Sequence, residues 1–114
     1  MAPLCVGLDP SPLRLGWGAV LLDDGAAVAC GMERLDLPGK GWSDDQAREA
    51  LRVVDERLGR DGHTVAAVYI EQPALPPVSG TKSAFNAGRA VQEVLVAARR
   101  RWPHADGPHF LQPA

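Results

Sequence analysis

The sequence predicts a single α/β domain on a mixed five-stranded sheet flanked by helices, and three observations lead there. Five short runs are strand-like, and the run at 65–71 is almost continuously apolar, as is typical of a central parallel strand. Two longer segments carry apolar residues at helical spacing instead. These helices precede and follow the run at 65–71. The predicted order is therefore a β-meander that is followed by a parallel βαβαβ unit.

The first three strands are expected to form the meander. Residues 4–9 form an apolar run that Pro10 ends, and a second strand is predicted at 17–22. The Asp-Asp-Gly segment at 23–25 is typical of a tight turn. Residues 26–32 are therefore predicted to return as the second strand of a hairpin.

Two helices and a last strand complete the predicted fold. Ser43, with Gln46 three residues later, forms a capping box that predicts the start of the first helix, and Gly59 or Gly62 is expected to end it. Its buried stripe would be Ala47, Ala50, Leu51, Val54 and Leu58. The second helix is predicted at 83–101, with a last strand at 109–112. Its inner stripe would be Ala84, Ala87, Val91, Val94, Leu95 and Ala98.

Length and composition restrict the class of protein. A chain of 114 residues allows one domain, and its formal net charge of -2 argues against a general nucleic-acid coat but permits a local basic face. Cys5 and Cys30 each lie in an apolar strand-like run, so both are predicted to be small buried residues in a reducing compartment. No signal peptide and no run of about 18 apolar residues is present, which predicts a cytoplasmic protein without membrane contact.

Two carboxylates are the candidate catalytic and metal-binding groups. Asp9 ends the first predicted strand and Glu71 ends the fourth. If these strands are parallel neighbours, both acids meet at one edge of the sheet, where ligand crevices form in α/β proteins. Carboxylate oxygens are the ligands that Mg²⁺ prefers, and phosphodiester hydrolysis is a common use of such a metal. Spacing alone leaves another interpretation open, in which Asp9 is a turn residue before Pro10 and Glu71 a solvated strand end.

The residues around the two acids resemble a known family. Asp9 follows Val-Gly-Leu and precedes a Gly-Trp-Gly strand at 16–18, and Glu71 lies in Tyr-Ile-Glu-Gln-Pro at 69–73. With the helix start at 79–90, these segments resemble the RuvC family of Holliday-junction resolvases, which has the ribonuclease H-like fold. The resemblance extends over essentially all of the chain in the right order. The Ile-Glu-Gln segment is its most specific part.

The resemblance implies an activity. RuvC-like enzymes are crossover junction endodeoxyribonucleases, which hydrolyse DNA phosphodiesters at four-way junctions with Mg²⁺, or with Mn²⁺ in its place. Asp9 and Glu71 correspond to the family's first two metal-binding acids. Cleavage of both sides of a junction implies a homodimer, with an isologous interface expected at the second helix.

One departure from the family concerns the remaining acids. Family members carry further acids on a C-terminal helix, whereas this sequence stops at Ala114, just after its last predicted strand. Asp106 is the only acid after Glu93, and it is expected at the opposite end of the sheet. Residues 1–114 are therefore interpreted as a ribonuclease H-like domain truncated at its C-terminus, with weak or absent cleavage of its own.

Basic residues near the predicted site are the candidate DNA contacts. Lys82 and Arg89 belong to the second helix, and Lys40 lies in a Gly-rich segment. Such side chains can bind phosphates, which receive most protein–DNA hydrogen bonds. The missing acids and the negative net charge support an alternative, a non-catalytic ribonuclease H-like module that binds nucleic acid or a protein partner.

Overall fold

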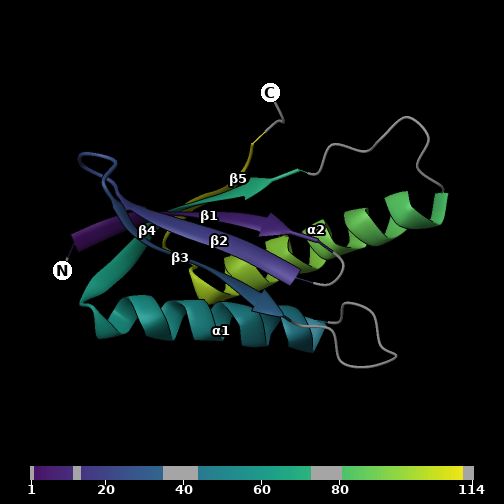
Figure 1. The fold of residues 1–114 in the computed structure, drawn as a ribbon, viewed down its shortest axis with the longest axis horizontal. Helices are drawn as coiled ribbons and strands as arrows, with labels where there is room; N and C mark the ends of the chain where they lie inside the picture. Colours follow the sequence, from purple (N-terminus) through teal and green to yellow (C-terminus); the bar gives the residue numbers. More distant parts are fainter. Residues whose placement is uncertain (1, 12–13, 35–43, 73–80, 112–114) are drawn as a thin grey trace.

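The computed structural model describes residues 2–11, 14–34, 44–72 and 81–111, without the side chains of Asp44 and of residues 81–87. Seven elements follow one another along the chain (Figure 1). They are β1 (Ala2–Pro10), β2 (Arg14–Leu21), β3 (Ala27–Arg34), α1 (Asp44–Arg60), β4 (His63–Glu71), α2 (Thr81–Arg101) and β5 (Asp106–Leu111). This order is the predicted one.

The five strands form one mixed sheet in the order β3-β2-β1-β4-β5. β1 lies in the centre, antiparallel to β2 and parallel to β4, and β5 extends the parallel part beyond β4. β2 and β3 pair as the antiparallel hairpin that the turn at 23–25 predicted. The α1 crossover returns the chain so that β1 and β4 end at the same edge of the sheet (Figure 1).

Both helices pack on one face of the sheet, where their buried residues and those of the strands form a single cluster (Figure 1). All five residues of the predicted α1 stripe are buried, as are the four described residues of the α2 stripe. From β1 the cluster receives Leu4, Val6 and Leu8, and from β2 it receives Leu15, Trp17 and Ala19. The intervening residues of these strands therefore point to the opposite face, which neither described helix covers.

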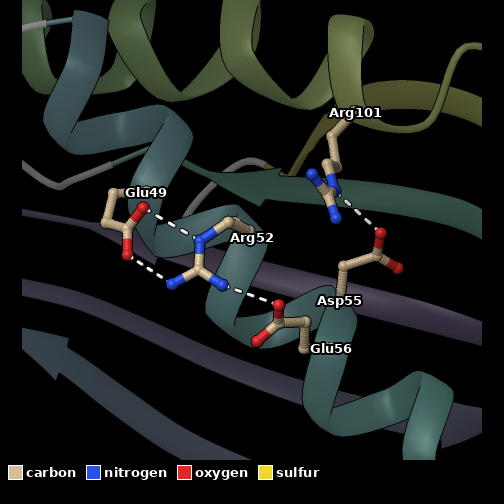
Figure 2. A network of polar contacts seen from close by, with 5 residues as sticks. All are labelled: Glu49, Arg52, Asp55, Glu56 and Arg101. Atoms are coloured by element: carbon tan, nitrogen blue, oxygen red, sulfur yellow. Dashed lines mark hydrogen bonds and ion pairs between the residues drawn. The ribbon is translucent and has the colours of Figure 1, made fainter.

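Asp55 of α1 joins the two helices by polar contacts. Its carboxylate accepts a hydrogen bond from Arg101 Nε at 2.7 Å (Figure 2). It also accepts one from Trp102 Nε1 at 3.0 Å. On the same helix, Arg52 donates to both Glu49 and Glu56. The hydrogen bonds from Arg52 lower the pKa of the Glu49 carboxyl below its ordinary value. The Asp55 contacts connect α1 to the end of α2, whereas those of Arg52 remain within α1.

Four strands begin earlier than predicted, and the difference is largest, three residues, in β2 and β5. β2 starts at Arg14 because Ser11 closes the turn that joins it to β1, with the Ser11 amide donating to the Arg14 carbonyl at 2.8 Å. β5 starts at Asp106, which pairs with Ala67 of β4. Asp106 is therefore a strand residue. The parallel pairing puts it level with Ala67 and Cys5, before the ends of β1 and β4 at which Asp9 and Glu71 lie and not at the far end of the sheet.

The burial predicted for both cysteines is wrong. Cys30 is exposed on the edge strand β3, and Cys5 is only partly buried on the uncovered face of β1, where burial raises the pKa of its thiol. The predicted cap at Ser43 and the phosphate contact at Lys40 lie outside the described residues. None of the described helices is long and apolar enough to cross a membrane.

Candidate functional site

Asp9 and Glu71 occupy equivalent positions at the ends of two neighbouring parallel strands. The register pairs Leu8 with Ile70, so that the next residue along each strand is one of the two acids. Leu8 and Ile70 are fully buried beneath the helices, whereas both acids are exposed. Strand alternation therefore directs both carboxylates to the uncovered face at the same edge. The strand placement that the sequence predicted for this pair is confirmed.

Both acids line a cleft of about 400 Å³ at this edge of the sheet. Leu111 of β5 also borders the cleft, and glycines of three strands contribute much of its lining: Gly7, Gly16, Gly18 and Gly31. A second hollow of about 380 Å³, beside Cys5, Val20 and Tyr69, shares Gly7, Gly18 and Leu111 with the first. The two hollows are therefore parts of one groove that runs from the acids along the uncovered face.

Backbone atoms form much of the floor of this groove. Gly7 of β1 lies opposite Gly18 of β2, and a Cβ atom added to either glycine would meet nothing within 4 Å. Gly16 differs, because it lies opposite Asp9, and an added Cβ would come within 3.6 Å of Asp9 Cβ. Glycine in a strand often marks a close approach of another group. The alternating glycines at 16 and 18 thus indicate the groove in the sequence, although the two acids alone do not predict it.

Trp17 supports the cleft from the helical side. Its indole Nε1 donates to Glu33 Oε1 at 3.2 Å, and the Arg57 guanidinium lies 5.3 Å from the ring centroid. Across the hairpin, Gly31 leaves the space that the indole fills, since an added Cβ would lie 2.9 Å from Trp17 Nε1. Trp17 belongs to the core cluster, and its side chain connects β2, β3 and α1 below the cleft.

The two acids fit the ligand preference of a divalent cation. No described residue donates a hydrogen bond to either carboxylate or forms an ion pair with it. Mg²⁺ takes oxygen ligands, retains several waters and needs only one or two protein carboxylates. Asp9 and Glu71 would supply those oxygens. Within the described ranges, no group of three or more His, Cys, Asp or Glu side chains could hold a metal.

Asp106 does not join the two acids. Its carboxylate lies 3.0 Å from His109 Nε2. Since β5 runs parallel to β4, the strand carries Asp106 at its start and Leu111 beside Glu71. The described residues therefore bring together the two acids that the sequence predicted for the site, and no third.

The predicted basic contacts are only partly described. Arg89 is exposed on α2, and no described contact joins it to either acid. Lys82 lies in the first turn of α2, which begins beyond the carboxyl ends of β1 and β4 (Figure 1). Its side chain, like all of Lys40, lies outside the described part of the chain.

The fold is that of the ribonuclease H-like class. Two solved structures with this fold are similar over 96% of this chain at 21% sequence identity: Thermus thermophilus RuvC in complex with a Holliday junction substrate, with a TM-score of 0.65, and T. thermophilus RuvC, with 0.62. An exopolyphosphatase from Cytophaga hutchinsonii is also similar, at a TM-score of 0.52 and 11% identity, over 96% of this chain and 34% of its own.

These similarities show the fold class and leave the family open. The present chain spans 64% of the length of the two RuvC chains. No protein-family model and no curated protein sequence matches it.

Proposed function

We propose that this domain is a RuvC-like, metal-dependent endodeoxyribonuclease that acts on branched DNA. The observation that carries the proposal is the pair of exposed carboxylates, Asp9 and Glu71, at the ends of adjacent parallel strands in one cleft. The ribonuclease H-like fold supports it, because one of the similar structures is RuvC in complex with a Holliday junction substrate. The proposal includes a cytoplasmic location for this enzyme.

The proposed chemistry assigns a role to each part of the cleft. Asp9 and Glu71 would hold Mg²⁺, or Mn²⁺ in its place, which when bound activates water and neutralises charge on the phosphate. Exposure leaves the carboxylate oxygens accessible to the ion and the substrate. The glycine floor allows a nucleic-acid strand to approach the backbone of β1 and β2 closely.

Binding of the DNA would depend on basic side chains around the acids. Arg89 is exposed on α2, and we propose that it contacts phosphates together with Lys82 and Lys40. Each neutralised phosphate should add about 0.9 to the slope of log affinity against log salt on duplex DNA. Two protomers would be needed to cut both sides of a four-way junction, so a homodimer is part of the proposal.

The test is nicking of a labelled four-way junction and a matched linear duplex, with the protein in excess over DNA so that slow cleavage is visible. We expect slow nicking that requires Mg²⁺ or Mn²⁺, because two carboxylates hold the ion weakly. Asp9→Asn and Glu71→Gln should each abolish it. Asp106→Asn is the matched control, because it removes an exposed carboxylate at the start of β5, away from the edge where the two acids lie.

A second candidate is a non-catalytic module with the same fold. The observation that favours it is that, among the described residues, no third metal-binding side chain joins the two acids. Junction binding without metal-dependent nicking would favour this candidate over the nuclease. A folded protein that neither binds nor nicks branched DNA at low salt would contradict both and leave a protein-interaction role.

A further inference from the structure

We propose that Gly16 is a positioning residue for the metal site, because its missing side chain keeps open the space beside the Asp9 carboxylate. The inference rests on the proposed function, since it assumes that Asp9 holds a divalent cation. It assigns a role to a residue of the neighbouring antiparallel strand, which supplies no ligand of its own.

Distances at the β1–β2 pair support this role. Gly16 lies directly opposite Asp9. A Cβ atom at position 16 would lie 3.6 Å from Asp9 Cβ, 3.7 Å from the Asp9 carbonyl oxygen and 4.0 Å from Asp9 Oδ2. A water bound to Oδ2 lies about 2.7–2.8 Å from it. A methyl group at van der Waals distance would therefore occupy the side of the carboxylate on which waters of a bound cation could lie.

The fold itself does not require glycine at this position. Among the described glycines, positive φ occurs at Gly25, Gly62 and Gly107 and not at Gly16, so an ordinary residue can adopt the backbone conformation of Gly16. An added Cβ would make only ordinary contacts at 3.6 Å or more. Glycine inside a strand lowers stability relative to residues with a side chain. What glycine provides here is therefore space next to Asp9.

Gly18 provides a matched comparison. It lies two residues further along the same strand, on the same face, and borders the same cleft. A Cβ at Gly18 would meet nothing within 4 Å, and in particular does not approach Asp9. Substitutions at positions 16 and 18 therefore change the same strand in the same way and differ in their distance from the carboxylate.

The experiment measures binding of Mn²⁺ alone, by paramagnetic broadening of backbone amide signals around the cleft during a titration. Gly16→Val should raise the Kd for Mn²⁺ about 10-fold or more and Gly16→Ala about 3-fold, comparable to other changes that act through a metal ligand. Gly18→Val and Gly18→Ala should leave the Kd within about 2-fold of wild type. The thermal midpoint of Gly16→Val should not fall, because β-branched residues favour strands.

The outcomes separate this inference from the proposal on which it rests. If Mn²⁺ broadening in the wild type does not depend on Asp9, as judged with Asp9→Asn, the metal site itself is wrong. If wild type binds Mn²⁺ and Gly16→Val binds it equally well, the metal site stands and the role of Gly16 is refuted. Equal losses at positions 16 and 18 would also refute it. Should Gly16→Val not fold, Gly16→Ala decides between these outcomes.

Discussion

Trp17 links the strand that lines the cleft to the helices on the other face of the sheet. It is 5% exposed, donates its indole hydrogen to Glu33 and lies beneath the guanidinium of Arg57. A buried indole is stabilised by both its area and its hydrogen bond. Because Trp17 lies one residue from both Gly16 and Gly18, its packing also fixes the strand that faces Asp9.

Gly31→Ala tests how tightly Trp17 is packed. The new methyl group would lie 2.9 Å from Nε1 and 3.0 Å from Cε2 and Cζ2 of the indole, which is closer than atoms approach without a shift. We expect a loss of about 1–3 kcal/mol in the free energy of unfolding, as for other overpacked sites. Urea denaturation measures it, with Gly18→Ala as the control. Equal midpoints for the two variants would show that the indole moves aside freely.

At the level of single residues, the two acids could be predicted but their surroundings could not. Asp9 and Glu71 were found because each ends an apolar run, and a local pattern suffices to place a strand end. Gly31 and Leu111 reach the cleft from β3 and β5 through the pairing register, which no local pattern specifies. The exposure of Cys30 has the same origin, since it follows from the edge position of β3.

Among the elements, α1 and α2 are held together by a polar contact as well as by their apolar stripes. Asp55 accepts a hydrogen bond from Arg101 at the end of α2 (Figure 2). It accepts a second from Trp102, the residue that follows α2. Trp102 is 8% exposed, so its indole N–H has little access to water if Asp55 is removed. The hydrogen bond to Trp102 should therefore contribute more to stability than the more exposed ion pair with Arg101.

Asp55→Ala should lower the free energy of unfolding by about 1–3 kcal/mol, because it leaves the buried Trp102 donor without a partner. Arg101→Ala removes only the ion pair, whose side chains are 37% and 33% exposed, and should cost about 1 kcal/mol or less. Chemical denaturation of both variants gives the two values. A larger loss for Arg101→Ala would mean that the ion pair, and not the Trp102 hydrogen bond, holds the helices together.

Helices and central strands were predictable because each has a strong local pattern. The five-residue stripe of α1 follows from helical spacing, and the apolar run of β4 from its central position. The first residues of β2 and β5 were missed because they have no such pattern. Arg14 and Asp106 are polar, and they extend their strands because Arg34 and Ala67 lie opposite them in the neighbouring strands.

Across the whole molecule, both helices cover one face of the sheet (Figure 1). The groove lies on the other face. β1 lies in the middle of the sheet, with hydrogen-bonded neighbours on both sides, and its residues Leu4 and Val6 are fully buried. β3 and β5 each have only one strand neighbour. The stability of the fold should therefore be highest at the centre of the sheet and fall toward both edges.

Native-state amide hydrogen exchange should follow this gradient. We expect the hydrogen-bonded amides of β1 to exchange only by global unfolding, and those at the outer edges of β3 and β5 to exchange by local opening. NMR-detected exchange over a range of low denaturant concentrations distinguishes the two regimes. If β1 amides instead exchanged as fast as those of β5, the sheet would open from its uncovered face, and the described fold would lack a stable centre.

The strand order also determines when the cleft can form during folding. The meander of β1, β2 and β3 is complete by Arg34 and needs only local hairpin contacts, which form quickly. Glu71 reaches Asp9 only after the chain has closed a loop that contains β2, β3 and α1, at an entropic cost. A nascent chain that has not yet added β4 carries Asp9 on a strand whose second edge is unpaired and open to association. The two acids therefore come together late in folding, and the same pairing that unites them closes that exposed edge.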